Sequence, residues 1–180
     1  MFLQSLLFKE NACHGHLMKT TEQPIKLQHI SERPECIPKL AAWFQKEWGH
    51  LNPEATVASR IKELQEKTNP LQLSLTIVAH SSRDNNELLG TYSLDLEDLS
   101  IRPNLSPWMA SVFVNPAHRK KGIGTMLVND ATQRARALGI HRLYLFTHDQ
   151  AGWYATMGWK TVEELLYRGE RITVMSIDLL

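Results

Sequence analysis

The chain has 180 residues, of which 43% are hydrophobic and 22% charged, as is typical of one globular domain with a buried core. Its formal net charge of +1 gives no indication of nucleic acid or membrane-surface binding, and no apolar run approaches the roughly 20 residues that span a membrane. Cys13 and Cys36 are too few for a disulfide framework or a zinc site, so we expect a reducing, cytoplasmic location and no metal.

Residues 1–24 show no regular pattern, and we interpret them as an N-terminal extension outside a domain that covers residues 25–180. Apolar periodicity then predicts a strand, two helices, three strands, a helix, a strand, a helix and two strands. These elements cover residues 25–30, 34–48, 53–67, 73–80, 87–99, 108–114, 123–138, 142–147, 150–157, 159–167 and 172–179. The order predicts an α/β domain with a mixed, mostly antiparallel sheet of about seven strands and about four helices.

The most informative stretch is 111–138, which combines a strand, a tight turn and a helix. The run Ser111-Val112-Phe113-Val114 is typical of a buried strand, and Asn115-Pro116 ends it. Arg119-Lys120-Lys121-Gly122-Ile123-Gly124 follows at the helix start. A helix N-terminus offers unpaired N–H groups and a partial positive charge, and glycine permits close approach. We therefore expect a phosphate site here; the alternative is a basic helix start whose glycines serve the turn alone.

The spacing of the glycines separates several kinds of phosphate loop. No Walker pattern occurs, and Leu127 stands where a dinucleotide fingerprint needs its third glycine. The R-x-x-G-x-G pattern that begins at Arg119, preceded by V-x-V, resembles the acetyl-CoA pyrophosphate loop of the GNAT acetyltransferase superfamily. The aromatic segment from Trp153 to Trp159 is similar to a second motif of that family, aromatic-Tyr-x-x-x-Gly-aromatic, and follows at the expected distance.

The resemblance covers the chain from about residue 25 to its end and implies a GNAT fold. A local run, Thr147-His148-Asp149-Gln150 before Trp153-Tyr154, is similar to the corresponding stretch of the actin N-terminal acetyltransferase, although one short match does not transfer a substrate.

The resemblance implies that acetyl-CoA is the co-substrate. In the family the strand before the loop splays from its neighbour, and its backbone pairs with the pantetheine arm. The residues that the resemblance places at acetyl-CoA are Val112, Phe113, Val114, Arg119, Lys120, Lys121, Gly122, Ile123, Gly124, Thr125 and Gln150. For the strand a simple core role is the alternative, and for Gln150 a polar helix start.

The implied reaction is the direct attack of a neutral amine on a thioester in a ternary complex. It needs a base for the amine proton, donors for the oxyanion and an acid for the thiolate. Tyr154 matches the tyrosine that lies near the cofactor sulfur in the family, and a phenol is protonated at neutral pH. Its alternative role is core packing. A backbone N–H on the splayed strand, such as that of Val112, is the candidate oxyanion donor.

The base is less clear, because many family members carry a Glu just before V-x-V and this chain has Met109-Ala110-Ser111 there. Asp95 and Glu97 alternate with leucines on the preceding strand and are our candidates, unless that side of the strand faces solvent. His148 is a further candidate, since imidazole titrates near neutrality, although capping of the next helix also explains it. Water could also carry the proton away.

The acceptor is less constrained, and a protein N-terminus, a lysine and a small-molecule amine all remain open. The main prediction is an acetyl-CoA-dependent N-acetyltransferase. A first rival is an acyl-CoA-binding sensor or regulatory module without turnover, and a second is a nucleotide-binding oxidoreductase. The sequence also leaves open a homodimer through the C-terminal strands.

Overall fold

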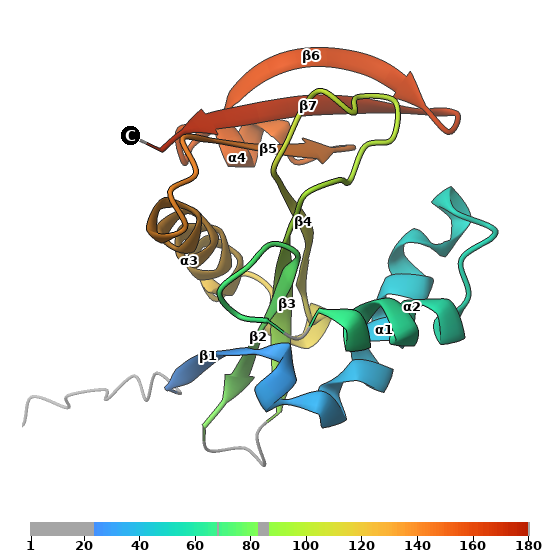
Figure 1. The fold of residues 1–180 in the computed structure, drawn as a ribbon, viewed down its shortest axis with the longest axis vertical. Helices are drawn as coiled ribbons and strands as arrows, with labels where there is room; N and C mark the ends of the chain where they lie inside the picture. The colour runs from blue at the N-terminus through green and yellow to red at the C-terminus, as the bar shows by residue number, and fades with distance from the viewer. Residues whose placement is uncertain (1–23, 68, 83–86, 180) are drawn as a thin grey trace, which may run out of the picture.

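The computed structural model describes residues 24–67, 69–82 and 87–179, so nearly all of the extension expected over residues 1–24 lies outside them. The described residues form seven strands and four α-helices in the order predicted from the sequence (Figure 1). In chain order these are β1 (Ile25–His29), α1 (Ile37–Trp48), α2 (Val57–Glu66), β2 (Leu75–Ser81), β3 (Leu88–Asp95), β4 (Trp108–Val114), α3 (Ile123–Ala137), β5 (Arg142–Thr147), α4 (Ala151–Ala155), β6 (Lys160–Tyr167) and β7 (Glu170–Asp178). Four 3-10 turns accompany them: η1 (Ile30–Glu32), η2 (Pro34–Cys36), η3 (Gly49–Leu51) and η4 (Pro116–His118).

The strands form one seven-stranded sheet in the order β1-β2-β3-β4-β5-β7-β6. Every neighbouring pair is antiparallel except β4 and β5, which run parallel. This arrangement confirms the predicted mixed, mostly antiparallel sheet and its α/β class. Among the described residues, no helix is long and apolar enough to cross a membrane.

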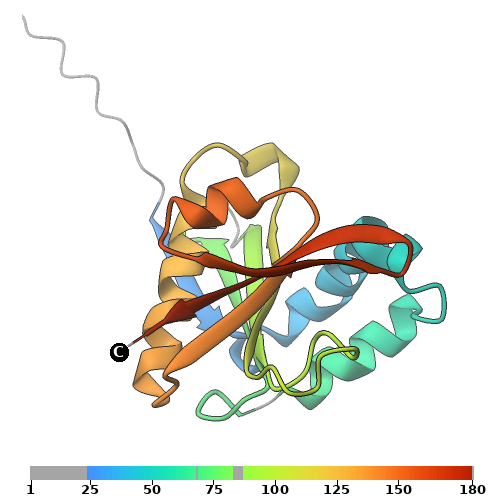
Figure 2. The same ribbon diagram turned by 90° about the horizontal axis from the view of Figure 1, so that it is seen from above.

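Helices cover the two faces of the first half of the sheet (Figures 1 and 2). On one face, Leu40 and Phe44 of α1 pack in a buried cluster with Val78 of β2 and Phe113 of β4. On the other face lies α3, whose buried residues at spacings of three and four join the main core cluster with β2, β3 and β5. Those residues are Ile123, Leu127, Ala131 and Ala135. The left-handed Gly139, with φ of 77°, follows the end of α3.

Most boundaries shift by a few residues from the prediction, and two of these shifts have clear local reasons. The second helix begins at Val57 and not at residue 53, because Thr56 caps it: the Thr56 hydroxyl accepts a hydrogen bond from the Ser59 N–H, and the Ser59 hydroxyl accepts one from the Thr56 N–H. The third strand ends at Asp95 and not at Leu99. The Asp95 carboxylate forms an ion pair with Lys67, and the chain then turns away from the sheet.

Candidate active site

A bulge interrupts β4 in the middle of the sheet. Ser93 of β3 pairs with Ala110, and Thr91 pairs with Phe113, so β4 has two residues between these pairs where β3 has one. At the bulge, Ser111 has a φ of 53°, in the left-handed region. A residue in this conformation allows a strand to accommodate an extra residue and to change direction.

The extra residue reverses the alternation of side chains along β4. Met109, before the bulge, belongs to the core cluster beneath α3. Phe113, four residues later, lies in the cluster beneath α1, while Val112 and Val114 pack against the α3 side. An uninterrupted strand would have put Met109 and Phe113 on the same face, since strand side chains alternate with a period of two.

The strands β4 and β5 separate from each other beyond their first contact. Trp108 pairs with Tyr144, and the described part of the chain contains no further register pair between these strands. The backbone of β4 from Val112 to Val114 therefore borders an opening on its β5 side. Such an opening in a sheet exposes N–H and C=O groups that an extended ligand can pair with.

The first of two cavities at this opening, which we call the cofactor cleft, has a volume of about 580 Å³. It brings together most of the residues that the sequence assigns to acetyl-CoA. Those lining it are Val112, Phe113, Val114, Arg119, Lys120, Gly122, Ile123, Gly124, Thr125 and Gln150. Lys121 does not line this cleft: its ammonium group donates to the carbonyl oxygen of Ala117 at 3.5 Å on the exposed side of the turn.

The start of α3 forms one wall of the cofactor cleft. Gly122 precedes the helix with φ of 77°, and no side chain caps the helix there. A Cβ atom on Gly124 would lie 3.3 Å from two ring atoms of Trp153, so glycine keeps this wall open. Arg119 is held beside the cleft, because its Nε donates to the carbonyl oxygen of Val114 at 3.1 Å and its guanidinium lies 5.6 Å from the centre of the Phe113 ring. Free N–H groups, glycine and a fixed cation fit a pyrophosphate group.

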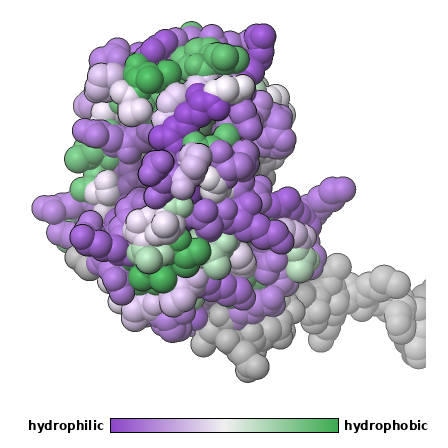
Figure 3. Space-filling model, turned by 90° about the vertical axis from the view of Figure 1, so that its right-hand side faces the viewer, coloured by the Kyte–Doolittle hydropathy of each residue, from purple (hydrophilic) through white to green (hydrophobic). Residues whose placement is uncertain are grey.

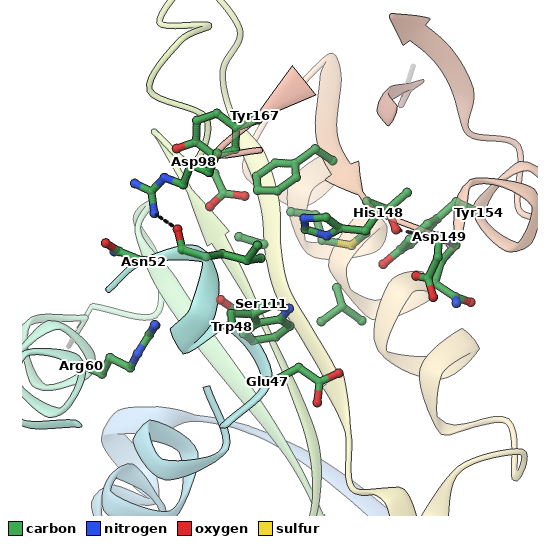
Figure 4. Close-up of a pocket in the computed structure, with 18 residues that line it drawn as sticks. Glu47, Trp48, Asn52, Arg60, Asp98, Ser111, His148, Asp149, Tyr154 and Tyr167 are labelled. Atoms are coloured by element: carbon green, nitrogen blue, oxygen red, sulfur yellow. Dashed lines mark hydrogen bonds between the residues drawn. The ribbon is translucent and has the colours of Figure 1, made fainter. Parts of the chain in front are cut away.

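The second cavity, which we call the acceptor cavity, has a volume of about 370 Å³ and lies on the other side of the bulge (Figure 4). Its walls come from six separate segments: the end of α1 with η3, the side of α2, the residues after β3, the bulge of β4, the end of β5 with α4, and the β6–β7 turn. Representatives of these segments are Trp48, Arg60, Asp98, Ser111, His148 and Tyr167.

The two cavities meet, and the residues that line both mark the junction. These residues are Glu47, Val112, Asp149, Gln150 and Tyr154. Tyr154 is 7% exposed and packs edge-on against Trp159, with the ring centres 6.0 Å apart. Burial raises the pKa of the Tyr154 hydroxyl above its usual value, so it stays protonated at neutral pH and can donate a proton.

The carboxylates expected to act as the base do not line the acceptor cavity. Asp95 is buried and ion-paired with Lys67 at 2.9 Å, and Glu97 is exposed. Both line a neighbouring cavity on the α2 side. Asp98 reaches the acceptor cavity instead. The strand alternation used in the prediction stops at Asp95, so it carries no information about the residues beyond.

A set of contacts that we call the clasp joins the two walls of the acceptor cavity. The guanidinium of Arg168 donates to the carbonyl oxygen of Leu51 at 2.7 Å (dashed in Figure 4). The Glu170 carboxylate lies 3.4 Å from the Nε2 atoms of both His50 and His148. The clasp thus connects the β6–β7 turn with η3, although 117 residues separate Arg168 from Leu51 along the chain. His148, the alternative base of the sequence prediction, lies in the cavity wall as part of it.

The separation of the parallel strands β4 and β5 beside two cavities agrees with the acyltransferase class of site that the sequence motifs imply. Residues 37–159 match the acetyltransferase (GNAT) family, and the chain therefore belongs to that family. The family and fold predicted from the loop and aromatic motifs are confirmed, with acetyl-CoA as the co-substrate. Among the curated proteins, none matches the sequence.

Solved structures share this fold at low sequence identity. One is an aminoglycoside 6'-N-acetyltransferase complexed with coenzyme A, with 18% identity, a TM-score of 0.66, and coverage of 86% of this chain and 97% of that chain. Another is yncA from Salmonella typhimurium with its cofactor acetyl-CoA, with 16% identity, a TM-score of 0.62, and coverage of 87% and 95%. A third is the spermidine/spermine N-acetyltransferase SpeG from Vibrio cholerae, with 17% identity, a TM-score of 0.61, and coverage of 86% and 92%.

Proposed function

We propose that the chain is an N-acetyltransferase that moves an acetyl group from acetyl-CoA to a primary amine by direct attack in a ternary complex. The observation that supports this most strongly is the junction of the two cavities at Val112 and Tyr154. A co-substrate lying along β4 in the cofactor cleft would present its thioester at that junction. An amine in the acceptor cavity would then meet it without crossing bulk solvent.

The residues of the junction supply the catalytic groups. The Tyr154 hydroxyl, which burial keeps protonated at neutral pH, donates a proton to the thiolate that leaves as the C–S bond breaks. The backbone N–H of Val112 borders the opening between β4 and β5 and is the candidate donor to the oxyanion. Arg119, Gly122 and Gly124 hold the pyrophosphate at the start of α3.

The acceptor cavity favours an amine that arrives as a cation. Glu47, Asp98 and Asp149 line it, and Trp48 and Tyr167 add aromatic surface. The two arginines of the lining are held by other partners, Arg60 by the side chain of Gln45 and Arg168 by the carbonyl oxygen of Leu51. Figure 3 looks onto the side of the molecule that carries α1 and α2, where the surface is mostly hydrophilic and apolar atoms form separate patches. A polar amine is therefore a better fit to this side than an apolar one.

The test is acetyl-CoA binding by calorimetry followed by thiol release with spermidine, kanamycin, a lysine-containing peptide and a peptide with a free N-terminus. We expect Tyr154→Phe to lower kcat by about 100-fold, the scale of general acid catalysis, while the Kd for acetyl-CoA stays unchanged. Tyr167→Phe is the matched control, because Tyr167 lines the acceptor cavity but not the cofactor cleft. This variant should lower kcat by less than about threefold.

Two results would contradict the proposal. Binding of acetyl-CoA without thiol release on any amine would favour a sensor module. Equal rates for Tyr154→Phe and the wild type would remove Tyr154 from the chemistry.

A further inference from the structure

Asp98 is an exposed residue in the wall of the acceptor cavity. It follows the end of β3 at Asp95 and precedes Leu99, which is 2% exposed and anchors the loop in a small core cluster. Figure 4 shows Asp98 and Tyr167 among the residues that surround the cavity. Asp98 and Ser111 line both this cavity and the neighbouring cavity on the α2 side. Asp98 is thus fixed by its neighbour in the chain and open to the space where an acceptor would bind.

The charges around Asp98 disfavour its ionised form. Desolvation by the protein around the carboxylate raises the pKa of Asp98 to about 7, although the residue as a whole is exposed; the like charge of Asp95 adds to the effect, and Glu63 adds less. Lys67 opposes the shift, but Lys67 is itself paired with Asp95 at 2.9 Å. Because Asp98 is exposed, its proton can exchange with solvent.

Apart from the carboxylates, three of the other titratable groups that line the cavity are held by contacts with neighbouring residues. His148 faces Glu170, and Arg168 is bound to the carbonyl oxygen of Leu51. Arg60 donates from Nε to the side-chain oxygen of Gln45 at 3.0 Å. The two tyrosines that line the cavity, Tyr154 and Tyr167, are the remaining titratable side chains apart from the carboxylates.

The carboxylates of the cavity differ in their location. Glu47 and Asp149 also line the cofactor cleft, and Glu47 lies 3.9 Å from Arg119, the cation assigned to the pyrophosphate. Among the described residues, Asp98 is the carboxylate that lines the acceptor cavity without lining the cofactor cleft. The bulge segment of β4 contributes Met109, Ala110 and Ser111, which carry no carboxylate.

We propose that Asp98 is the proton acceptor for the amine in this reaction, acting through the water of the acceptor cavity. The proposal depends on the acetyl transfer proposed above. An amine that arrives as a cation first loses one proton to solvent, and the neutral amine then loses a second proton to Asp98 as its N–C bond to the acetyl carbon forms. The C–S bond breaks, and the sulfur takes one proton from Tyr154. The proton held by Asp98 then passes to solvent, and Tyr154 regains one, so protons and charges balance.

The first measurement is independent of catalysis. A carbon-13 NMR titration of the protein without substrates, compared with Asp98→Asn for assignment, should show the Asp98 carboxyl titrating near neutrality. A midpoint near 4 would overturn the proposal whatever the activity of the enzyme.

The pH dependence of the stability of the fold gives a second readout that does not depend on catalysis. Because the folded-state pKa is raised, the folded form loses stability as pH rises from about 4 towards 7. The Tm of Asp98→Asn relative to the wild type should therefore rise between pH 5 and pH 8.

The second measurement is the pH dependence of kcat, with saturating acetyl-CoA and the panel amine of highest kcat/KM. For the wild type we expect kcat to rise with pH and to level off above an apparent pKa near 7. Asp98→Asn should lower kcat by about 100-fold at pH 8 and abolish the rise of kcat with pH. Asp98→Glu should restore part of the rate. Glu66→Gln is the control and changes an exposed carboxylate of the neighbouring cavity on the α2 side. It should keep both the kcat of the wild type and its rise with pH.

The outcomes separate this proposal from the proposed function. A wild-type enzyme that acetylates an amine, with an Asp98→Asn variant of equal kcat and pH profile, would overturn the role of Asp98 alone. Thiol release by the wild type on none of the amines would overturn the proposed function and this proposal with it. Calorimetry of acetyl-CoA with each variant establishes that the fold and the cofactor cleft are intact.

Discussion

The cofactor cleft and the acceptor cavity are neighbours that are built in different ways. Most of the cofactor cleft comes from one stretch of chain, residues 112–125, and depends on backbone groups, on two glycines and on the start of α3. The acceptor cavity takes its side chains from six segments spread from Glu47 to Arg168. A ligand group common to all reactions of a family can be held by backbone, whereas a variable acceptor needs side chains.

This contrast has an energetic consequence. Backbone sites tolerate little change in shape, because a misplaced Cβ atom displaces main chain and core together. Side-chain sites on exposed turns tolerate more, because exposed hydrogen bonds contribute on the order of 1 kcal/mol each. Substitutions on the cofactor side should therefore have larger effects than those on the acceptor side.

The strongest test of the contrast is Gly90→Ala. Gly90 pairs with Val114, and a Cβ atom there would lie 2.7 Å from the Phe113 carbonyl oxygen and 3.0 Å from Cδ1 of Leu127. We expect the free energy of unfolding to fall by about 2–3 kcal/mol, the upper part of the usual range for overpacking. Urea denaturation measures this change.

Gly152→Ala is the matched control for that experiment. A Cβ atom on Gly152 has no atom within 4 Å, so the alanine should leave the stability equal or slightly higher. Similar losses for both variants would show that the close approach of β3 and β4 is not the cause.

The next test, Gly124→Val, addresses the cofactor cleft directly. The valine would press on Trp153 and project from the start of α3, so the Kd for acetyl-CoA should rise by about 30-fold, or about 2 kcal/mol. Calorimetry measures the Kd, and circular dichroism checks that the domain remains folded. An unchanged affinity would rule out the anion site at the start of α3.

The smallest effect is expected from Arg168→Ala, which removes one hydrogen bond of the clasp. The KM for the amine should rise about three- to fivefold, or about 1 kcal/mol, while the Kd for acetyl-CoA stays constant. Arg171→Ala on the same hairpin is the control, because that side chain is 79% exposed and lies 3.9 Å from Glu164. Equal changes in amine KM and acetyl-CoA Kd would show that the two cavities are not independent.

The same contrast explains how much of the molecule could be predicted from its sequence. The order of elements followed from periodicity, and the cofactor residues followed from a contiguous motif, with Lys121 the one that the structure places elsewhere. The start of α2 was harder, because the reciprocal cap of Thr56 and Ser59 carries no apolar signal.

The acceptor cavity could be predicted much less well. Nothing in the local sequence around Asp98 distinguishes it from Asp95 or Glu97, because the distinction arises from where β3 ends and from the ion pair with Lys67. The contact between Arg168 and Leu51 joins parts of the chain that no short motif connects. Such features depend on tertiary structure, and the sequence signals them weakly.

The bulge at Ser111 also makes β4 sensitive to chain length. Because the extra residue decides which face Phe113 occupies, deleting one residue between Ala110 and Phe113 would exchange the sides of every later residue in the strand. The aromatic ring would turn towards α3 and the valines towards α1. In laboratory evolution of the protein towards new amine acceptors, this segment should therefore tolerate single substitutions but not insertions or deletions. The β6–β7 turn is a better place to vary the length of the chain.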